Sequence, residues 1–424
     1  MNKLLSIAAA ICASTLCAQD LSGDWQGKLG SGGTGLRVIV SIAKEGAGWK
    51  ATFYSIDQST DGIPVTSVQL DGSNVKMKVE VIHGYYDGKV SADGNSIDGL
   101  WTQAQPQPLT LNRATKETAW VRDPSPHQVQ FITVDTDVKL EVLDWGGSGR
   151  PLVLLTGLGN NAHVFDKFAT KLTDSYHVYG ITRRGFGVSS APATGYSADR
   201  LADDVLAVID ALKIVKPVLA GHSIAGEELS SIGSRHPEKV AGLIYLDAGY
   251  PYAFYDRSRG NLGIDLIELE KKLERLQPGT SPAEQKLLVR ELLETSLPGF
   301  EKDLKELQKN LDENPAAAGP APKIPAPSLA IQAGLQKYTD IKGPILAIYA
   351  VPHDLGPQFR NDPTARAAAE ARDLESTGAQ AKAFETGLPN ARVVRLAHAS
   401  HYVFLSNEAD VLREMNAFIA SLPK

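Results

Sequence analysis

The chain has 424 residues, of which 43% are hydrophobic, and this length predicts two or three domains that can each bury a core. The formal net charge of −6 gives no reason to expect nucleic acid or an anionic membrane as a partner. Both cysteines, Cys12 and Cys17, lie close to the N-terminus.

The N-terminal segment has the form of a secretory signal. Lys3 precedes an apolar stretch from Leu4 to about Leu16, which is too short to span a bilayer as a stable helix, and the small residue Ala18 follows. We therefore expect residues 1–18 to be a signal peptide and the protein to be exported, either periplasmic or secreted, with no membrane span. The mature chain would contain no cysteine, which excludes disulfides, thiolate catalysis and cysteine–zinc sites.

Residues 19–113 are predicted to form a small antiparallel β domain, a barrel or sandwich. Apolar residues alternate along short runs such as "LRVIVSI" and "VKMKVEVI", and Asp-Gly pairs typical of tight turns interrupt the later runs. Trp25 and Trp101 lie near the two ends of this segment, where we expect them to fill the core. The segment resembles small lipocalin-like β domains attached to exported bacterial hydrolases. A polar, proline-containing linker is expected at 114–128.

From residue 129 to 424 the pattern changes to that of an α/β domain. After a predicted hairpin, short continuous apolar runs such as "PLVLL", "PVLAG" and "GLIYL" alternate with helical stretches. This pattern predicts a mostly parallel sheet covered by helices on both faces. Residues 249–342 contain charged helical runs and no convincing strand, so we expect a helical cap above the carboxyl edge of the sheet.

The stretch "AGHSIAG" places Ser223 at the junction of an apolar strand and a helix. A sharp turn there needs small neighbours, which Gly221, Ala225 and Gly226 provide, and it would expose the serine hydroxyl above the sheet. The helix N-terminus and the amide of Ile224 could then stabilise negative charge on a carbonyl oxygen. The context of the motif favours a nucleophile over a small residue in a tight turn.

The segment from about 129 to 422 resembles the α/β-hydrolase family. The residues that carry the likeness are "AGHSIAG", "LLTGLGNNAHVF", "RRGFGVSS" and the ending "LAHASHYVFLSNEADVLREMNAFIASL". The sequence departs from the common pattern at the second elbow glycine, at the start of the oxyanion loop, at Thr182-Arg183-Arg184 and at Ser400-His401. None of these departures removes a catalytic atom.

A serine nucleophile needs a base and a carboxylate that orients the base. The resemblance places the base in the loop after the last strand, which favours His401 over His398. We expect Asp354, after the next-to-last strand, to be the acid, with Asp247, one strand earlier, as the alternative.

Four further residues near the expected site also have expected roles. Backbone amides of Leu158 and Ile224 are the expected oxyanion hole. His222 is interpreted as a packing residue, and His163 as a residue that orders the oxyanion loop.

These residues together predict a serine hydrolase that cleaves an ester, or a related carbonyl bond, of a small molecule without metal or cofactor. Two alternatives remain open. One is a cofactor-free peroxidase or acyltransferase on the same triad, and the other is a non-catalytic binding protein on a hydrolase scaffold. The sequence does not indicate the substrate, the role of the β domain or the oligomeric state.

Overall fold

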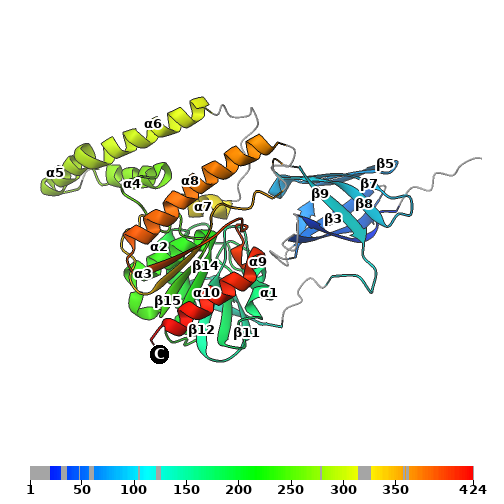
Figure 1. The fold of residues 1–424 in the computed structure, drawn as a ribbon, viewed down its shortest axis with the longest axis horizontal. Helices are drawn as coiled ribbons and strands as arrows, with labels where there is room; N and C mark the ends of the chain where they lie inside the picture. The colour runs from blue at the N-terminus through cyan, green and yellow to red at the C-terminus, as the bar shows by residue number, and fades with distance from the viewer. Residues whose placement is uncertain are drawn as a thin grey trace, which may run out of the picture.

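The computed structural model describes residues 20–29, 36–46, 48–56, 62–103, 106–120, 126–276, 279–313, 326–356, 359 and 362–423. The expected signal peptide lies outside the described residues, as does the middle of the expected linker. Figure 1 shows two sheets, one before and one after that linker.

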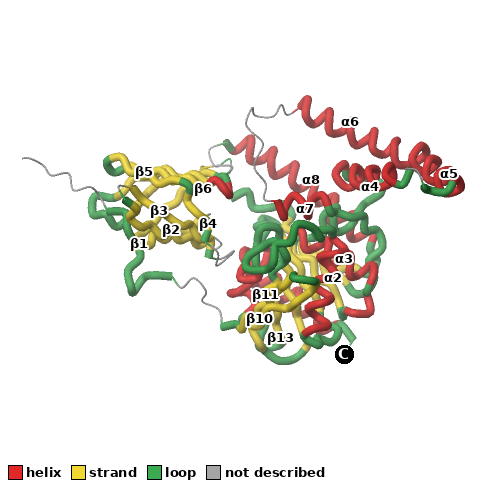
Figure 2. The backbone as a smooth tube through the Cα atoms, turned by 180° about the vertical axis from the view of Figure 1, so that it is seen from behind, coloured by secondary structure: helices red, strands yellow, loops and turns green. Residues whose placement is uncertain are grey.

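The first sheet has nine antiparallel strands in the order β4-β3-β2-β1-β9-β8-β7-β6-β5. Figure 2 shows this sheet curling around its own interior. The strands are β1 (Gly23–Leu29), β2 (Leu36–Glu45), β3 (Gly48–Ser55), β4 (Ile63–Val65), β5 (Ser67–Asp71), β6 (Asn74–Val79), β7 (Gly84–Val90), β8 (Ser96–Thr102) and β9 (Pro106–Arg113).

Two tryptophans fill the core of this barrel-like sheet, as the sequence predicted. The Trp25 side chain is fully buried and its indole N–H donates to the Leu21 carbonyl at 2.8 Å. Trp101 is buried and stacks on Phe53, with ring centroids 4.9 Å apart. Both rings thus bury large apolar surfaces while the polar indole nitrogen of Trp25 keeps a partner.

The second sheet has eight strands in the order β10-β11-β13-β12-β14-β15-β16-β17. The β10–β11 hairpin and the β11–β13 pair are antiparallel, whereas the pairs from β13 to β17 are parallel. The strands are β10 (Gln128–Asp135), β11 (Val138–Gly146), β12 (Arg150–Leu155), β13 (Tyr176–Ile181), β14 (Val218–His222), β15 (Gly242–Leu246), β16 (Ile345–Ala350) and β17 (Ala391–Leu396).

Helices cover both faces of this sheet, which confirms the predicted fold class (Figure 1). The helices outside the cap are α1 (Asp166–Ala169), α2 (Ala198–Ala211), α3 (Gly226–Arg235), α8 (Pro363–Gly387), α9 (Val403–Ser406), α10 (Glu408–Ser421) and the 3-10 turns η3 (Ala162–Phe165), η4 (Ser223–Ala225) and η5 (Pro237–Lys239). Consecutive residues of a strand enter opposite cores: Leu243 packs with the α2, α3 and α8 side, and Ile244 with the α1, α9 and α10 side. Central strands buried on both faces explain the continuous apolar runs in the sequence.

The described part of the expected cap consists of helices and connecting loops, without a strand. It contains α4 (Leu262–Glu274), α5 (Pro282–Glu291), the π-helix η6 (Leu292–Ser296), α6 (Leu297–Glu313) and α7 (Ala326–Ala333). In both views α4, α5 and α6 lie on the far side of α8 from the sheet. The exposed faces of these cap helices carry apolar as well as charged side chains. Leu287 on α5 is 66% exposed, and Leu293 on η6 is 63% exposed. Among the described helices, none has both the length and the apolar character that a membrane crossing requires.

A buried ion pair fastens α2 to the loop after β13 and provides a test of the fold. The Arg184 guanidinium donates to both carboxylate oxygens of Asp204 at 2.6 Å, and both side chains are buried. Asp204→Asn would leave a buried cation without its counter-charge, so we expect the free energy of unfolding to fall by about 3–5 kcal/mol. Urea denaturation measures this loss.

The matched control is Asp210→Asn on the same helix, because the Asp210 carboxylate is exposed and pairs with Lys239 at 3.1 Å. We expect it to change the unfolding free energy by less than about 1 kcal/mol. Equal effects of the two substitutions would contradict the role given to the buried pair.

Candidate active site

Ser223 stands at the predicted sharp turn between β14 and α3. Its φ angle of +53° lies in the left-handed region, which costs a non-glycine residue about 1–2 kcal/mol. The turn is tight: a Cβ on Gly226 would meet the Ala248 carbonyl oxygen at 2.0 Å, and one on Gly221 would meet the Ala225 side chain at 3.0 Å. Small residues are therefore required on both sides of a strained serine, as at a functional position.

Apolar side chains surround the serine turn. Ile224 belongs to a small apolar cluster that also contains Leu158, from the expected oxyanion loop, and Tyr252, from the segment that leads into the cap. Burial raises the pKa of the Tyr252 hydroxyl, and a hydrogen bond with the Ser223 side chain acts in the opposite direction. The structure thus brings Leu158 and Ile224 together beside Ser223, with a tyrosine hydroxyl facing the serine.

His401 is held by Asp247. The Nδ1 atom of His401 lies 2.7 Å from the Oδ2 atom of Asp247, whose side chain is fully buried while that of His401 is 41% exposed. The two residues follow β17 and β15, so both lie at the carboxyl edge of the sheet, where Ser223 follows β14. No hydrogen bond joins Ser223 to His401 among the described residues, which is common before a ligand is bound.

Asp354, the expected acid, does not contact His401. Its Oδ1 atom accepts the Gly356 amide at 2.9 Å and lies 3.7 Å from Arg366, and the side chain is 42% exposed. The chain after β16 presents His353 to the interior and turns the next side chain, Asp354, towards solvent. Of the two aspartates that the sequence offered, Asp247, the alternative, is therefore the one that contacts His401.

Asp247 accepts four hydrogen bonds. Besides His401, its Oδ2 atom accepts from Nε2 of His353 at 2.9 Å, and its Oδ1 atom accepts from the Tyr250 hydroxyl and the Ala350 amide, each at 3.0 Å. Burial acts to raise the pKa of Asp247, but the hydrogen bonds and charges of the two histidines lower it to about 2. The carboxylate is thus ionised and fixed in one orientation. Sequence reasoning missed His353 and Tyr250 because neither belongs to the pattern that locates the triad.

The other histidines near the site have structural contacts. His222 is buried, its Nε2 atom lies 3.0 Å from the His401 carbonyl oxygen, and burial lowers its pKa to about 3. A neutral His222 therefore donates to the backbone that carries His401, in addition to packing against its ring. His398 is 60% exposed and lies 3.7 Å from Glu370, whereas His401 contacts Asp247.

A buried salt bridge ties the expected oxyanion loop to α3. Arg183 donates to the two Glu228 oxygens at 2.7 and 2.8 Å and to the Thr156 carbonyl at 2.8 Å. The neighbouring Glu227 is fully buried, and neither carboxylate oxygen has a hydrogen-bond partner within the described part of the chain. Burial raises the pKa of Glu227 well above its ordinary value, which favours the neutral acid.

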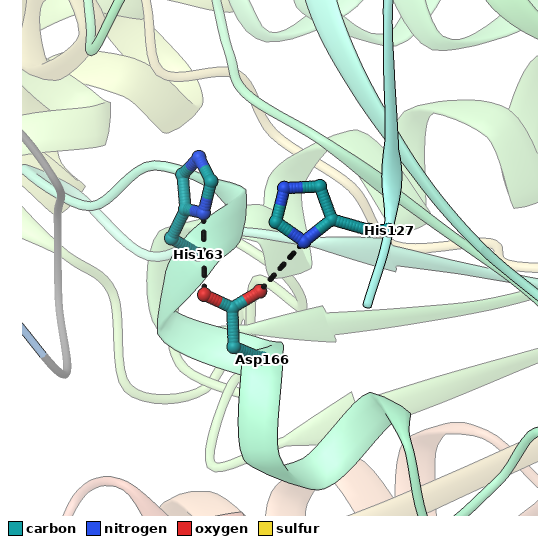
Figure 3. A group of neighbouring side chains, drawn as sticks. All are labelled: His127, His163 and Asp166. Atoms are coloured by element: carbon teal, nitrogen blue, oxygen red, sulfur yellow. Dashed lines mark hydrogen bonds and ion pairs between the residues drawn. The ribbon is translucent and has the colours of Figure 1, made fainter. Parts of the chain in front are cut away.

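A second histidine–carboxylate group lies behind the oxyanion loop (Figure 3). The Asp166 carboxylate faces His163 Nδ1 at 3.2 Å and His127 Nδ1 at 3.5 Å, and Glu141 lies 3.6 Å from the other ring nitrogen of His163. Burial lowers the pKa of His163, but the two carboxylates raise it to about 10. A protonated His163 that donates to Asp166 and forms an ion pair with Glu141 accounts for this geometry. The His163 amide also donates to Asn161, in line with the expected loop-ordering role.

Two groups of histidine and aspartate side chains consist of residue types that can bind a metal ion. In the group of Figure 3, and in the group of Asp247, His353 and His401, one ligand atom of each residue lies within 4.8 Å of the others. In the second of these groups Asp247 already accepts hydrogen bonds from both imidazoles, an arrangement that protons satisfy without a metal.

The family model described as "alpha/beta hydrolase fold" matches residues 150–408. A "2-(acetamidomethylene)succinate hydrolase" of Mesorhizobium japonicum is 29% identical over 141 residues, which are 32% of this chain and 50% of the relative. A "putative non-heme haloperoxidase" of Mycobacterium phage D29 is 32% identical over 129 residues, which are 30% of this chain and 46% of the relative. The chain thus spans about half the length of these curated relatives.

Among solved structures, an esterase from Exiguobacterium antarcticum aligns with 69% of this chain and 100% of its own, at 19% identity and a TM-score of 0.46. At that score the likeness carries no argument about this chain.

The protonated His163 predicts a pH dependence of stability. Its pKa is raised from 6.5 to about 10, so its contribution is fully present below pH 6.5 and is lost as the pH rises through about 10. We expect the unfolding free energy of the wild type to fall more between pH 6.5 and 10 than that of His163→Gln. The control His236→Gln removes a partly exposed histidine that lies 3.9 Å from Glu238, and it should keep the wild-type slope. A His163→Gln slope equal to the wild type would contradict the assignment.

Proposed function

Because the chain belongs to the α/β-hydrolase fold family, we propose that it is a serine hydrolase that cleaves carboxylic esters of small molecules. Ser223 is the nucleophile, His401 the base and Asp247 the acid. The observation that carries the proposal is the 2.7 Å contact between Asp247 and His401, at the sheet edge where the strained Ser223 turn also lies.

In the first step, the Ser223 hydroxyl oxygen attacks the ester carbonyl carbon and its proton passes to Nε2 of His401. Asp247 accepts the Nδ1 proton of His401, so it fixes the tautomer that leaves Nε2 free as the base. The charge that forms on the carbonyl oxygen is stabilised by the amides of Leu158 and Ile224. The tetrahedral intermediate then expels the alcohol, which takes the proton from His401.

In the second step, water attacks the acyl group on Ser223, and His401 accepts the proton of that water. Collapse of the second tetrahedral intermediate breaks the bond to Ser223 Oγ, which recovers its proton from His401. The products are a carboxylic acid and the free enzyme. The chemistry uses side chains and backbone amides of this chain and consumes only water.

The apolar cluster beside Ser223 supports an ester with an apolar group near the scissile bond. Ile224, Tyr252 and Ile331 are buried or partly buried in it, and Leu158 and Phe186 pack against them. The large cap supports selection among such esters. Export by the signal peptide at 1–18 stays part of the proposal and implies substrates outside the cytoplasm.

A peroxidase is the second candidate, favoured by the phage relative whose name contains haloperoxidase. Hydrogen peroxide would then replace water in the second step and attack the acyl group on Ser223. The product released from the enzyme would be a peracid. Dependence of product on hydrogen peroxide distinguishes the two reactions, and competition by an added alcohol identifies an acyltransferase. A binding protein on a hydrolase scaffold would show neither product.

The first prediction concerns the nucleophile. A fluorophosphonate probe should label purified protein at Ser223, because only a serine activated by a base attacks such phosphorus centres at neutral pH. Peptide mapping locates the label. Ser223→Ala should lose it, and the matched control Ser230→Ala, on α3, should retain it. A folded wild-type protein that takes no label would refute the proposal and favour the binding protein.

The second prediction distinguishes the two aspartates. Asp247→Asn should lower kcat/KM for an activated ester such as p-nitrophenyl acetate by about 10³–10⁴-fold, because His401 would lose its orienting carboxylate. Asp354→Asn should stay within about threefold of the wild type, since that side chain faces solvent. The reverse order of effects would assign the acid to Asp354.

A further inference from the structure

His353 is placed between two carboxylates from different elements. Its Nε2 atom lies 2.9 Å from Asp247 Oδ2, and its Nδ1 atom lies 3.0 and 3.1 Å from the two oxygens of Asp373 on α8. The His353 backbone amide also donates to Asp373 at 2.6 Å. A neutral imidazole has one N–H and could satisfy one carboxylate only, whereas an imidazolium satisfies both.

His353 and His401 share one atom of the acid. Both donate to Oδ2 of Asp247, at 2.9 and 2.7 Å, and their ring centroids are 6.2 Å apart. A positive charge on His353 is therefore close enough to oppose protonation of His401, and its hydrogen bond takes up part of the negative charge that Asp247 offers to His401.

From this geometry we propose that Asp373 and His353 are positioning residues for the triad, which hold Asp247 in place and set the pH at which His401 becomes an active base. The proposal rests on the proposed function, because it gives these residues a role in that same site. Neither side chain is required to contact the substrate. They act on the base through Asp247.

The groups that face His353 come from three parts of the chain. Asp247 and the Tyr250 hydroxyl follow β15, Asp373 belongs to α8, and His401 follows β17. Burial lowers the pKa of His353, but hydrogen bonds and charge from Asp247, followed by those from Asp373, raise it to about 9. His353 is therefore positively charged through neutral pH, and it loses its charge as the pH passes about 9.

The test is the pH profile of kcat/KM for p-nitrophenyl acetate, measured for the wild type, His353→Gln and Asp373→Asn. Glutamine keeps an N–H donor towards Asp247 but removes the positive charge, and Asp373→Asn removes the carboxylate that keeps His353 protonated. Both substitutions make protonation of His401 easier. We expect the acid limb of both variants to shift to higher pH by about 0.5–1 unit.

A third variant separates position from charge. His353→Leu removes the donor as well as the charge, so we expect kcat at the pH optimum to fall by about tenfold or more, with His353→Gln recovering most of it. The matched control is His398→Gln, on the same side of the site but 60% exposed, which should leave both the limb and kcat unchanged. Circular dichroism and thermal melting verify that each variant is folded.

The outcomes distinguish this proposal from the one it rests on. If the wild type neither takes the fluorophosphonate label nor hydrolyses the ester, the proposed function fails. If the wild type is labelled and active but His353→Gln and Asp373→Asn keep its acid limb, the hydrolase stands and the role of His353 is refuted. A uniform loss of activity at every pH, without a shift of the limb, would show only a structural role.

Discussion

Asp247 is fully buried, and an isolated carboxylate in such a place would be protonated or displaced, because removing its charge from water costs several kcal/mol. Four donors and at least one neighbouring positive charge offset that cost. Three of the donors are side chains from the segments after β15, β16 and β17, so the carboxylate joins three loops at the edge of the sheet. The orientation of His401, and with it the proposed chemistry, depends on this interaction.

The backbone supports the same arrangement. Ser223 and Asp247 both have positive φ angles, +53° and +49°, although neither is a glycine. Each ends a fully buried central strand, and neighbouring parallel strands hold their register through hydrogen bonds along their length. In both segments the strained residue directly follows the strand, at the edge of the sheet where the proposed nucleophile and acid lie. The sheet thus holds the strained backbone conformations of Ser223 and Asp247, which a mobile loop would lose.

Much of this could be predicted from the sequence. Apolar runs without alternation identified the buried strands, because a strand that is buried on both faces has no polar residue at every second position. The glycines around Ser223 identified a turn that only small residues permit. The sequence favoured Asp354 over Asp247 as the acid, whereas Asp247 contacts His401, since each follows a strand and the sequence does not tell which neighbouring side chain faces inwards. His353 was missed for the same reason. Its partner Asp373 is 20 residues away on a helix, and only the fold brings them together.

The helix α8 has 25 residues, a length of about 37 Å at 1.5 Å per residue. Near its middle, Asp373 holds His353, and two turns later Gln380 donates to the Phe254 carbonyl in the segment that leads into the cap. One helix therefore contacts both the histidine beside the proposed acid and the segment that leads into the cap. A substitution that alters the position of α8 would change the surroundings of both at once.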